Sequence, residues 1–352
     1  MCVLGTGIAL VPSATRSTGP WLDGTRATSL ARVANRPIVC HVLDALRDAG
    51  LAPASVVVPE AAAGELQACL APEPPSELST HSYRDTPGGA LRKALLEAAA
   101  RDEAGPCVLH RADGLLGAPL SGFLEALAEG SFDALLLVGR PSPAAPSLRV
   151  VDDSSDAAIS SITGVGGACI LGAGALRAAC ALGLHESDID LTELAASLAS
   201  EGVDVKVHAV PGWRRFAGVT RDLLDLNRAV LDTLEPAEAP EEHDNGNSFE
   251  GRLQIDPTAT IIASTIVGPV VVGADAKITD SYIGPHTSIG ERVQIDGAEI
   301  ERSIVLADAR VLHVGGRLTA SVVGRDARIF RDFSVPRALR LQIGDGDEVA
   351  LC

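Results

Sequence analysis

The sequence predicts an N-terminal α/β domain followed by a C-terminal parallel β-helix. Through the first 234 positions, short apolar segments alternate with amphipathic segments, as do the strands and helices of a parallel α/β sheet. Aliphatic residues then recur every five to seven residues from Val272 to Ile329. This spacing fits neither an α-helix nor a single strand, but it fits short strands wound into a coil.

The C-terminal repeats are expected to turn one aliphatic side chain inward on each face of a triangular coil. Gly or Asp often follows and takes the corner, as in Ile283-Gly284 and Ile289-Gly290. At about 18 residues per turn, Leu253–Ile329 makes about four coils. The pattern resembles hexapeptide-repeat, left-handed parallel β-helix proteins. The alternative is an antiparallel β-sandwich with regular turns, whose strands rarely keep so short a period for so long.

The N-terminal elements follow from apolar periodicity and from Pro and Gly at the segment ends. Strands are expected at 3–12, 54–58, 107–110, 134–138 and 203–208. Helices are expected at 37–50, 61–70, 89–101, 122–129, 191–200 and 221–234. Ligands of such sheets bind outside the carboxyl ends of the strands. The loop after Val11, the turn at 87–89 and Asp113 therefore form the candidate binding edge.

Four segments are predicted along the chain: an α/β domain at 1–234, an acidic Pro-rich linker at 235–250, the β-helix at 251–330 and a C-terminal tail at 331–352. The 352 residues suit two domains better than one core. With 29 basic and 46 acidic residues, the formal net charge is −17. This balance argues against nucleic acid or an anionic membrane as a partner.

The seven cysteines are scattered, with no C-x-x-C spacing, which indicates reduced thiols rather than a disulfide framework or a zinc site. The first 12 residues lack a basic region and a cleavage site, and no apolar run reaches 18 residues. We therefore expect a cytoplasmic protein without a membrane span.

Four segments resemble the sugar-phosphate nucleotidyltransferases, and in particular the long form of glucose-1-phosphate thymidylyltransferase. Ser29–Leu51 (SLARVANRPIVCHVLDALRDAGL) is similar to the family's LxPVANKP segment. Gly212–Leu234 (GWRRFAGVTRDLLDLNRAVLDTL) is similar to its GWWxDTGxxxDLLxANRxVL segment. Asp280–Val311 and Arg337–Val349 are similar to the family's C-terminal tail. The resemblance implies a Rossmann-like nucleotidyltransferase domain followed by a left-handed parallel β-helix.

The resemblance also implies a reaction. In this family a sugar-1-phosphate attacks the α-phosphorus of a nucleoside triphosphate and pyrophosphate leaves. The simplest case converts dTTP and glucose-1-phosphate to dTDP-glucose and pyrophosphate. The protein contributes positioning and cationic charge. The family uses a glycine-rich loop, an Arg and a Lys, and two Asp that hold Mg²⁺.

This chain departs from the family pattern at four places that handle charge. The glycine-rich loop falls on Ser13–Thr18, which contains no glycine and therefore should not cradle a triphosphate in the same way. The family's Lys falls on Thr28. The sugar-phosphate motif E-K-P is absent from 149–162, and the second metal Asp falls on Phe216. The catalytic residues are therefore unknown.

Other positions keep a match. Gly89 matches the turn under the base, although Arg84 replaces the Gln that recognises the base. Ser13 and Arg16 are the candidate nucleotide-binding residues of the segment aligned with the triphosphate loop, where Arg16 either meets an anion or is a solvated arginine. Asp113 corresponds to the first Mg²⁺ ligand, or alternatively caps a loop. Asp188 corresponds to the acid that holds sugar hydroxyls, or caps the following helix.

Three functional hypotheses follow. The chemistry favours a homologue with weak or lost catalysis that binds a sugar nucleotide or regulates an active paralogue, as a homo-oligomer or hetero-oligomer. The alternative is an active Mg²⁺-dependent enzyme that makes dTDP-glucose; several losses, each costing about 10²–10³-fold in rate, argue against it. Acyl transfer by the β-helix, with His286 or His313 as base, is disfavoured because no insertion loop is present to cover an acyl-CoA.

Overall fold

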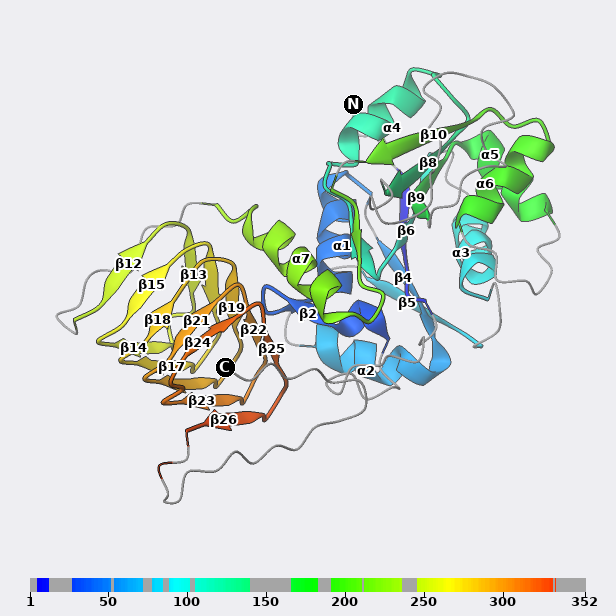
Figure 1. Cartoon of the computed structure of the whole chain (residues 1–352). Helices are drawn as coiled ribbons and strands as arrows, with labels where there is room; N and C mark the ends of the chain where they lie inside the picture. The colour runs from blue at the N-terminus through cyan, green and yellow to red at the C-terminus, as the bar shows by residue number, and fades with distance from the viewer. Residues whose placement is uncertain are drawn as a thin grey trace. The chain divides into compact units, whose positions relative to one another are not determined.

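The computed structural model describes residues 5–12, 27–51, 54–71, 78–84, 89–101, 105–139, 166–182, 191–210, 212–235, 246–331 and 333. The chain divides into two compact units. The described residues of the first unit lie within 5–30 and 38–215, and those of the second lie within 31–37 and from Phe216 onward. The predicted combination of an α/β domain and a β-helix is confirmed (Figure 1).

A seven-stranded sheet forms the centre of the first unit, with strand order β10-β8-β9-β6-β1-β4-β5. Six strands run in one direction, and β9 is antiparallel to both of its neighbours. The strands are β1 (Thr6–Leu10), β4 (Ser55–Pro59), β5 (Ser79–Tyr83), β6 (Cys107–Arg111), β8 (Ala134–Gly139), β9 (Gly166–Leu171) and β10 (Val205–Val210). The sheet is therefore mixed, rather than fully parallel as the alternation of elements predicts.

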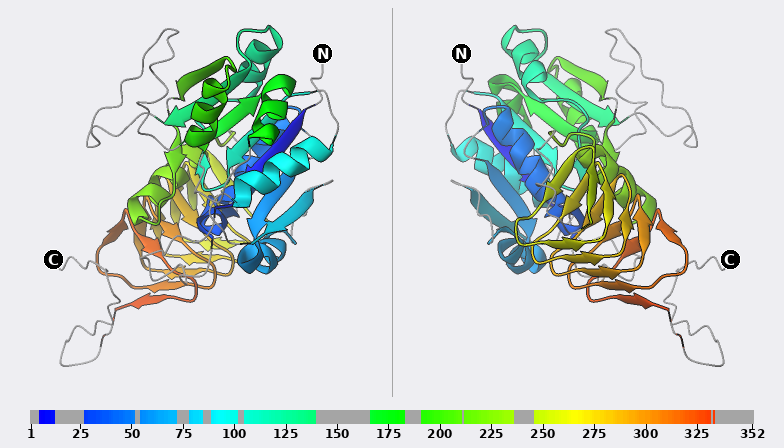
Figure 2. Two further views of the ribbon diagram at one scale, coloured as in Figure 1. Left: turned by 90° about the vertical axis from the view of Figure 1, so that its right-hand side faces the viewer. Right: turned by 90° about the vertical axis from the view of Figure 1, so that its left-hand side faces the viewer.

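Helices cover both faces of this sheet (Figures 1 and 2). On one face lie α1 (Ile38–Asp48), α2 (Glu60–Leu70) and α4 (Ser121–Ala128). On the other lie α3 (Gly89–Ala100), α5 (Ala173–Ala181) and α6 (Leu191–Ser200). Successive residues of β1 are buried on opposite faces of the sheet. Ala9 belongs to the apolar cluster with α1, α2 and α4, and Ile8 and Leu10 belong to the cluster with α3, α5 and α6.

The sequence missed the longer elements β5, β9 and α5 of this unit, and it also missed two-residue strands at Gly114–Leu115 and Arg214–Arg215. The edge strand β5 is Ser-Thr-His-Ser-Tyr and lacks the apolar pattern of a buried strand. β9 opens with Gly166 and Gly167, residues that weaken a strand prediction. Each of the predicted helices is present with shifts of a few residues at the ends, and β10 begins two residues later than predicted.

Three parallel five-stranded sheets build the β-helix of the second unit, so it makes five coils rather than about four. The extra strand, β12, begins at Ser248, upstream of the predicted repeats. The remaining strands are β13 (Leu253–Ile255), β14 (Thr260–Ile262), β15 (Thr265–Val267), β16 (Val270–Val272), β17 (Lys277–Thr279), β18 (Tyr282–Ile283), β19 (Thr287–Ile289), β20 (Gln294–Asp296), β21 (Glu299–Glu301), β22 (Ile304–Val305), β23 (Arg310–Leu312), β24 (Arg317–Thr319), β25 (Val322–Val323) and β26 (Arg328–Phe330).

Aliphatic side chains stack in register inside the β-helix. Ile261 pairs with Ile278, which pairs with Ile295, and the column continues through Val311 to Ile329. Most of these residues belong to one buried apolar cluster. The spacing of five to seven residues in the sequence therefore reflects one inward side chain per face.

The corners use glycine differently from the prediction. Positive φ angles occur at Asp275 (55°), Arg292 (55°), Asp308 (65°) and Asp326 (57°), rather than at the glycines that follow the inward residues. Gly290 is required for a different reason: a Cβ there would lie 2.7 Å from the backbone nitrogen of Ala307. Glycine thus allows close approach of successive coils, while Asp and Arg take the left-handed conformation.

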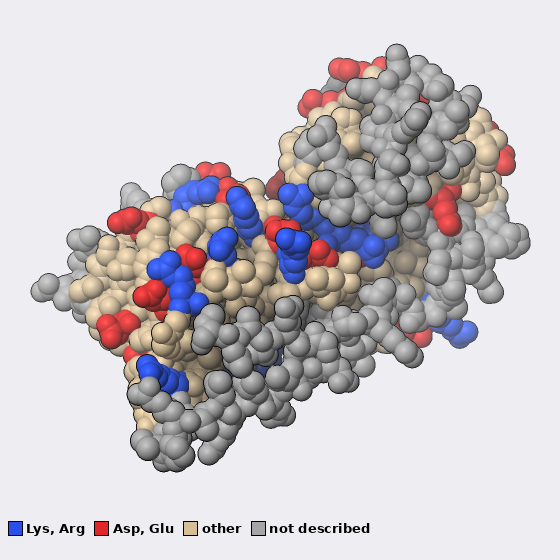
Figure 3. Space-filling view, viewed as in Figure 1, with Lys and Arg blue, Asp and Glu red and all other residues tan. Residues whose placement is uncertain are grey.

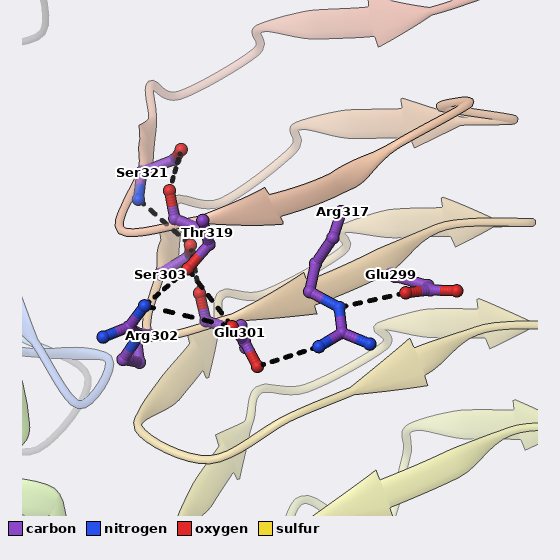
Figure 4. Close-up of polar contacts among 7 residues, drawn as sticks. All are labelled: Glu299, Glu301, Arg302, Ser303, Arg317, Thr319 and Ser321. Carbon is purple, nitrogen blue, oxygen red and sulfur yellow. Dashed lines mark hydrogen bonds and ion pairs between the residues drawn. The ribbon is translucent and has the colours of Figure 1, made fainter.

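Hydroxyl groups at the corners connect successive coils. Ser303 Oγ donates to the carbonyl oxygen of Glu301 (2.7 Å) and accepts from the backbone nitrogen of Ser321 (3.1 Å). On the adjoining face, Arg317 Nε donates to Glu299 (3.0 Å), and Arg317 Nη1 lies 3.5 Å from Glu301 (Figure 4). Since the ion pairs are exposed, the serine bonds are expected to stabilise the stack more.

The second unit also includes helix α7 (Thr220–Leu231) and the short strands β2 (Arg32–Val33) and β3 (Arg36–Pro37), which form a hairpin. Asn227 is buried and joins all three parts. Its Oδ1 accepts from Ala34 N (2.8 Å) and Ser288 Oγ (2.7 Å), and its Nδ2 donates to the carbonyl oxygen of His286 (3.2 Å). The β-helix is thus tied to two segments that are distant in sequence.

Candidate active site

The candidate site lies at the carboxyl end of β6, where the chain turns through Asp113 into the short strand β7 (Gly114–Leu115). β7 pairs antiparallel with β11 (Arg214–Arg215), and Arg215 lies opposite Gly114. This pairing brings a residue about 100 positions away in sequence next to Asp113. All of these residues belong to the first unit.

Two arginines hold the Asp113 carboxylate. Arg111 donates from Nε to Oδ1 (3.0 Å) and from Nη2 to Oδ2 (2.8 Å), which is a bidentate pair. Arg215 donates from Nε to Oδ2 (2.8 Å). Only 1% of the Asp113 side chain is exposed, compared with 14% for Arg111 and 28% for Arg215. Both carboxylate oxygens therefore already accept charged hydrogen bonds.

The electrostatics of Asp113 follow from these contacts. Burial by itself would raise the pKa of the Asp113 carboxyl, but the charges and hydrogen bonds of Arg111 and Arg215 outweigh burial and lower that pKa below its ordinary value. The carboxylate is ionised at neutral pH, and it balances one of the two guanidinium charges.

A tryptophan lies beside this cluster. The indole of Trp213 packs where Gly114, Gly139 and Gly167 leave room: a Cβ on Gly167 would lie 2.9 Å from its Cε2 and a Cβ on Gly114 2.6 Å from its Cη2. The ring centroids of Trp213 and His110 are 6.1 Å apart in an edge arrangement. The absence of side chains at these glycines thus fixes the backbone that leads to Arg215.

His110 is the buried neighbour of the cluster. Its Nδ1 lies 2.7 Å from the carbonyl oxygen of Arg111, so Nδ1 carries the proton in the neutral ring. Burial lowers the pKa of His110 from 6.5 to about 4, although the Arg111 carbonyl and the Asp113 charge act in the opposite direction. His110 is therefore neutral at physiological pH and contributes no charge to the cluster.

The other candidate residues from the sequence lie elsewhere or outside the description. Ser13, Arg16 and Asp188 fall outside the described residues. Gly89 is the first residue of α3 and follows β5, so it lies at the same sheet edge as Asp113. Two strands, β4 and β1, lie between β5 and β6, so the ends of β5 and β6 are roughly 14 Å apart.

The sequence analysis missed Arg111, Arg215 and Trp213. A sequence signal for the two arginines does exist. Arg111 stands two residues before Asp113, and Arg215 stands directly before Phe216. Thus the two segments that should each supply an acid, around Asp113 and around Phe216, contain one acid and two arginines.

Comparison with known proteins identifies the family. No family model matches the sequence. A glucose-1-phosphate thymidylyltransferase from Streptomyces griseus is 28% identical over 355 residues, which cover 97% of this chain and 96% of that protein. The low-salt glycan biosynthesis nucleotidyltransferase Agl11 from Haloferax volcanii is 25% identical over 367 residues, covering 99% and 98%. The chain is a member of the sugar-phosphate nucleotidyltransferase family.

Two further comparisons agree. A glucose-1-phosphate thymidylyltransferase from Streptomyces antibioticus is 33% identical over 166 residues, which cover 47% of this chain and 46% of that protein. A solved structure assigned as a glucose-1-phosphate thymidylyltransferase from Bacillus anthracis, in complex with sucrose, superposes with a TM-score of 0.51 at 12% identity. It covers 66% of this chain and 97% of that chain. At this identity the superposition supports the fold alone.

The residues described at this site do not fit the Mg²⁺ that the nucleotidyltransferase family implies. Mg²⁺ takes carboxylate oxygens in octahedral geometry, whereas both oxygens of Asp113 accept from guanidinium groups. Phe216, at the family's second acid position, is fully buried and offers no ligand atom. Among the residues that the structure describes, no group of three or more His, Cys, Asp or Glu side chains is placed to hold a metal ion.

The β-helix carries a separate charged surface. A groove on the β17, β20, β23 and β26 face is lined by side chains of both signs, and Figure 3 shows Lys and Arg interspersed with Asp and Glu over the β-helix. The lining includes Asp275, Lys277, Arg292, Asp308, Arg310 and Arg328. Arg292 pairs with Asp308 through Nε (2.7 Å) and Nη2 (2.9 Å). These opposite charges largely neutralise each other.

The two histidines considered for acyl transfer occupy corners of the coil, with φ of 60° at His286 and 52° at His313. His286 Nε2 lies 2.9 Å from the Asp232 carboxylate, and the His286 carbonyl oxygen accepts from Asn227. His313 lies 3.7 Å from Asp296. These contacts give His286 a structural role in holding α7.

None of the helices in the described part of the chain combines the length and the apolar character that crossing a bilayer requires.

Proposed function

We propose that this chain is a sugar-1-phosphate nucleotidyltransferase homologue with weak or lost catalysis, which binds a sugar nucleotide or regulates an active paralogue. The observation that carries the proposal is the double ion pair of Asp113 with Arg111 and Arg215. A carboxylate that has two guanidinium partners is a poor ligand for a hydrated Mg²⁺. The proposed oligomer, with like chains or with the paralogue, rests on the β-helix and its stackable coils.

Nucleotidyl transfer explains why this arrangement weakens catalysis. The reaction develops negative charge around the α-phosphorus and the leaving pyrophosphate, and catalysis depends on cations placed in advance. Removing one such group typically costs about 10²–10³-fold in rate. Here the second acid position is a buried Phe216, and Thr28 is buried in place of the family's Lys. A homologue built this way retains binding contacts more readily than turnover.

One observation favours the alternative, an active Mg²⁺-dependent glucose-1-phosphate thymidylyltransferase. Asp113 remains at the carboxyl end of β6, where ligands of open α/β sheets bind. The Streptomyces relatives carry this activity in their names. The alternative requires Asp113 to exchange its arginine partners for a metal ion when substrates bind.

The test measures binding and turnover in one preparation. Thermal unfolding is followed with and without dTDP-glucose, and pyrophosphate is assayed after addition of dTTP, glucose-1-phosphate and Mg²⁺. We expect dTDP-glucose to raise the melting temperature while pyrophosphate release stays at the level of an Asp113→Asn control. Turnover that disappears in the control, together with a melting temperature that Mg²⁺ raises, would support the active enzyme instead.

A further inference from the structure

Among the side chains described in the Asp113 cluster, positive charges outnumber negative ones. One carboxylate faces two guanidinium groups, and burial gives His110 a pKa of about 4, so the histidine adds no charge at neutral pH. The protein as a whole has a net charge of −17, so this local surplus is an exception to its general field. Arg215 shares the Asp113 carboxylate with Arg111 and is partly buried, and a partly buried charge is stabilised by a further counter-charge. Such a cluster attracts an anion.

Arg215 supplies the donors. It contacts Asp113 through Nε alone, and neither of its Nη atoms donates to any residue in the described ranges. A guanidinium held at Nε presents its remaining N–H groups in a fixed fork, which matches the oxygens of a phosphate. With 28% of its side chain exposed, Arg215 is open to a ligand and yet is anchored.

The backbone around Arg215 is held in position. β11 pairs with β7, which fixes Arg215 opposite Gly114. The adjacent Trp213 fills the space that Gly114, Gly139 and Gly167 leave open. Arg111 fixes the other side of the carboxylate with a bidentate pair. A phosphate bound here would therefore meet a preorganised donor rather than a mobile surface side chain.

The location agrees with phosphate binding. β6 neighbours β1 in the sheet and runs parallel to it, so both strands end at the carboxyl edge, where ligands of such sheets bind. In the family, two Asp and Mg²⁺ share this position. Here Phe216 removes one acid, and Arg111 and Arg215 add two fixed positive charges in the place of a divalent cation.

We propose that Arg215, supported by Asp113 and Arg111, replaces the metal ion and holds the diphosphate of a nucleoside diphosphate sugar without Mg²⁺. This inference rests on the proposed function, since it names the group through which that site holds its ligand. The chemistry required of the ligand is a diphosphate, which a nucleotide sugar and free pyrophosphate share.

The test is calorimetric titration of the whole chain with dTDP-glucose, once in EDTA and once in Mg²⁺. Equal affinity in the two buffers is expected. Arg215→Gln keeps a planar polar group but removes the charge and the fork, and about tenfold or greater weakening is expected, since a charged hydrogen bond contributes at least that factor. The affinity of Arg215→Lys should lie between those of the wild type and Arg215→Gln, because lysine keeps the positive charge but lacks the forked guanidinium donors.

Arg214→Gln is the matched control. Arg214 is the exposed neighbour of Arg215 on the same short strand, and its Nη1 donates to the carbonyl oxygen of Trp213 (3.3 Å). This variant removes the same charge from the same strand and should leave the affinity unchanged. Circular dichroism and melting temperature establish that each variant is folded. If Arg215→Gln fails to fold, Arg215→Lys carries the comparison.

The outcomes separate the two proposals. Binding that needs Mg²⁺, or an Arg215→Gln variant that binds like the wild type, overturns the metal-replacement inference and leaves the proposed function standing. Inorganic pyrophosphate that binds through Arg215, while dTDP-glucose does not bind, supports the anion site and contradicts the nucleotide-sugar function. If neither compound binds, the metal-replacement inference and the sugar-nucleotide-binding role are both overturned, and regulation of a paralogue is what is left of the proposed function.

Discussion

Three charged side chains meet at the carboxyl end of β6, and only Asp113 among them is negative. The sequence places Asp113 at a strand end, and this position is as expected. Its environment depends on Arg215, which is about 100 residues away in the sequence and is brought next to Asp113 by the pairing of β11 with β7. Local sequence patterns carry no information on such a contact, so the role of Asp113 as a metal ligand stays a prediction that the geometry makes less favourable.

His110 gives a pH-dependent prediction. Burial lowers its pKa from 6.5 to about 4 in the folded protein. Below pH 6.5 the unfolded chain therefore takes up a proton that the folded chain resists. The free energy of unfolding should fall between about pH 6.5 and pH 4, by about 3 kcal/mol in all, and the loss from this group should stop below pH 4.

Urea unfolding of the wild type and of His110→Asn over this pH range checks the prediction. The Asn side chain can still donate toward the Arg111 carbonyl oxygen but does not titrate. The plot of unfolding free energy against pH should be steeper for the wild type than for the variant by about 1.4 kcal/mol per pH unit, which corresponds to the uptake of about one more proton on unfolding. Parallel curves would show that His110 is protonated without cost in the folded state.

At the scale of elements, periodic segments were predicted well and irregular ones were not. α6 runs over Leu191–Ser200 as expected, and α1 begins at Ile38 beside the predicted start. The polar edge strand β5 and the glycine-initiated β9 were missed, because tertiary pairing, not local pattern, makes them strands. The hairpin of β2 and β3 was missed because Asn227 and the β-helix hold it from a distance.

The corner hydroxyls should stabilise the β-helix according to their depth in the stack. Ser281 Oγ donates to the Thr279 carbonyl oxygen (2.6 Å) and accepts from Ala298 N (3.2 Å). Ser281→Ala leaves that buried N–H without a partner and should lower the free energy of unfolding by about 1–2 kcal/mol. Ser321→Ala, in the last coil, should cost less than about 0.5 kcal/mol, since Ser321 Oγ only donates to Thr319. Equal losses of unfolding free energy for Ser281→Ala and Ser321→Ala in denaturant titrations would contradict this dependence on position in the stack.

Asn227 should hold α7 and the hairpin on the β-helix. Asn227→Ala removes bonds to Ala34, Ser288 and His286 and leaves buried groups unpaired, so a loss of about 2–4 kcal/mol is expected. Hydrogen exchange at the Ala34 amide should accelerate in parallel. Asp232→Asn is the control, because its ion pairs are exposed and should contribute less than about 1 kcal/mol. An unchanged Ala34 exchange rate would contradict the assignment.

For the whole molecule, the sequence predicted the two-part architecture because both periodicities are repeated many times. It underestimated the coils because β12 lies upstream of the regular repeats. Function is harder to infer at this scale, since nearly the full length of the chain matches relatives named as nucleotidyltransferases while the charged groups of the site differ. The match over nearly the full length therefore accounts for the scaffold. The presence of Phe216 at one acid position, and of two arginines around Asp113, bears on catalysis.

The most direct measurement of the central claim is pyrophosphate release from dTTP and glucose-1-phosphate in Mg²⁺, measured beside the Streptomyces griseus glucose-1-phosphate thymidylyltransferase. We expect release at least about 10³-fold slower than that of the Streptomyces griseus enzyme, and no faster than that of a folded Asp113→Asn variant. Turnover of about 1 s⁻¹ or more that is lost in the variant would contradict this claim. Asp113 would then exchange its arginine partners for a metal ion during the reaction.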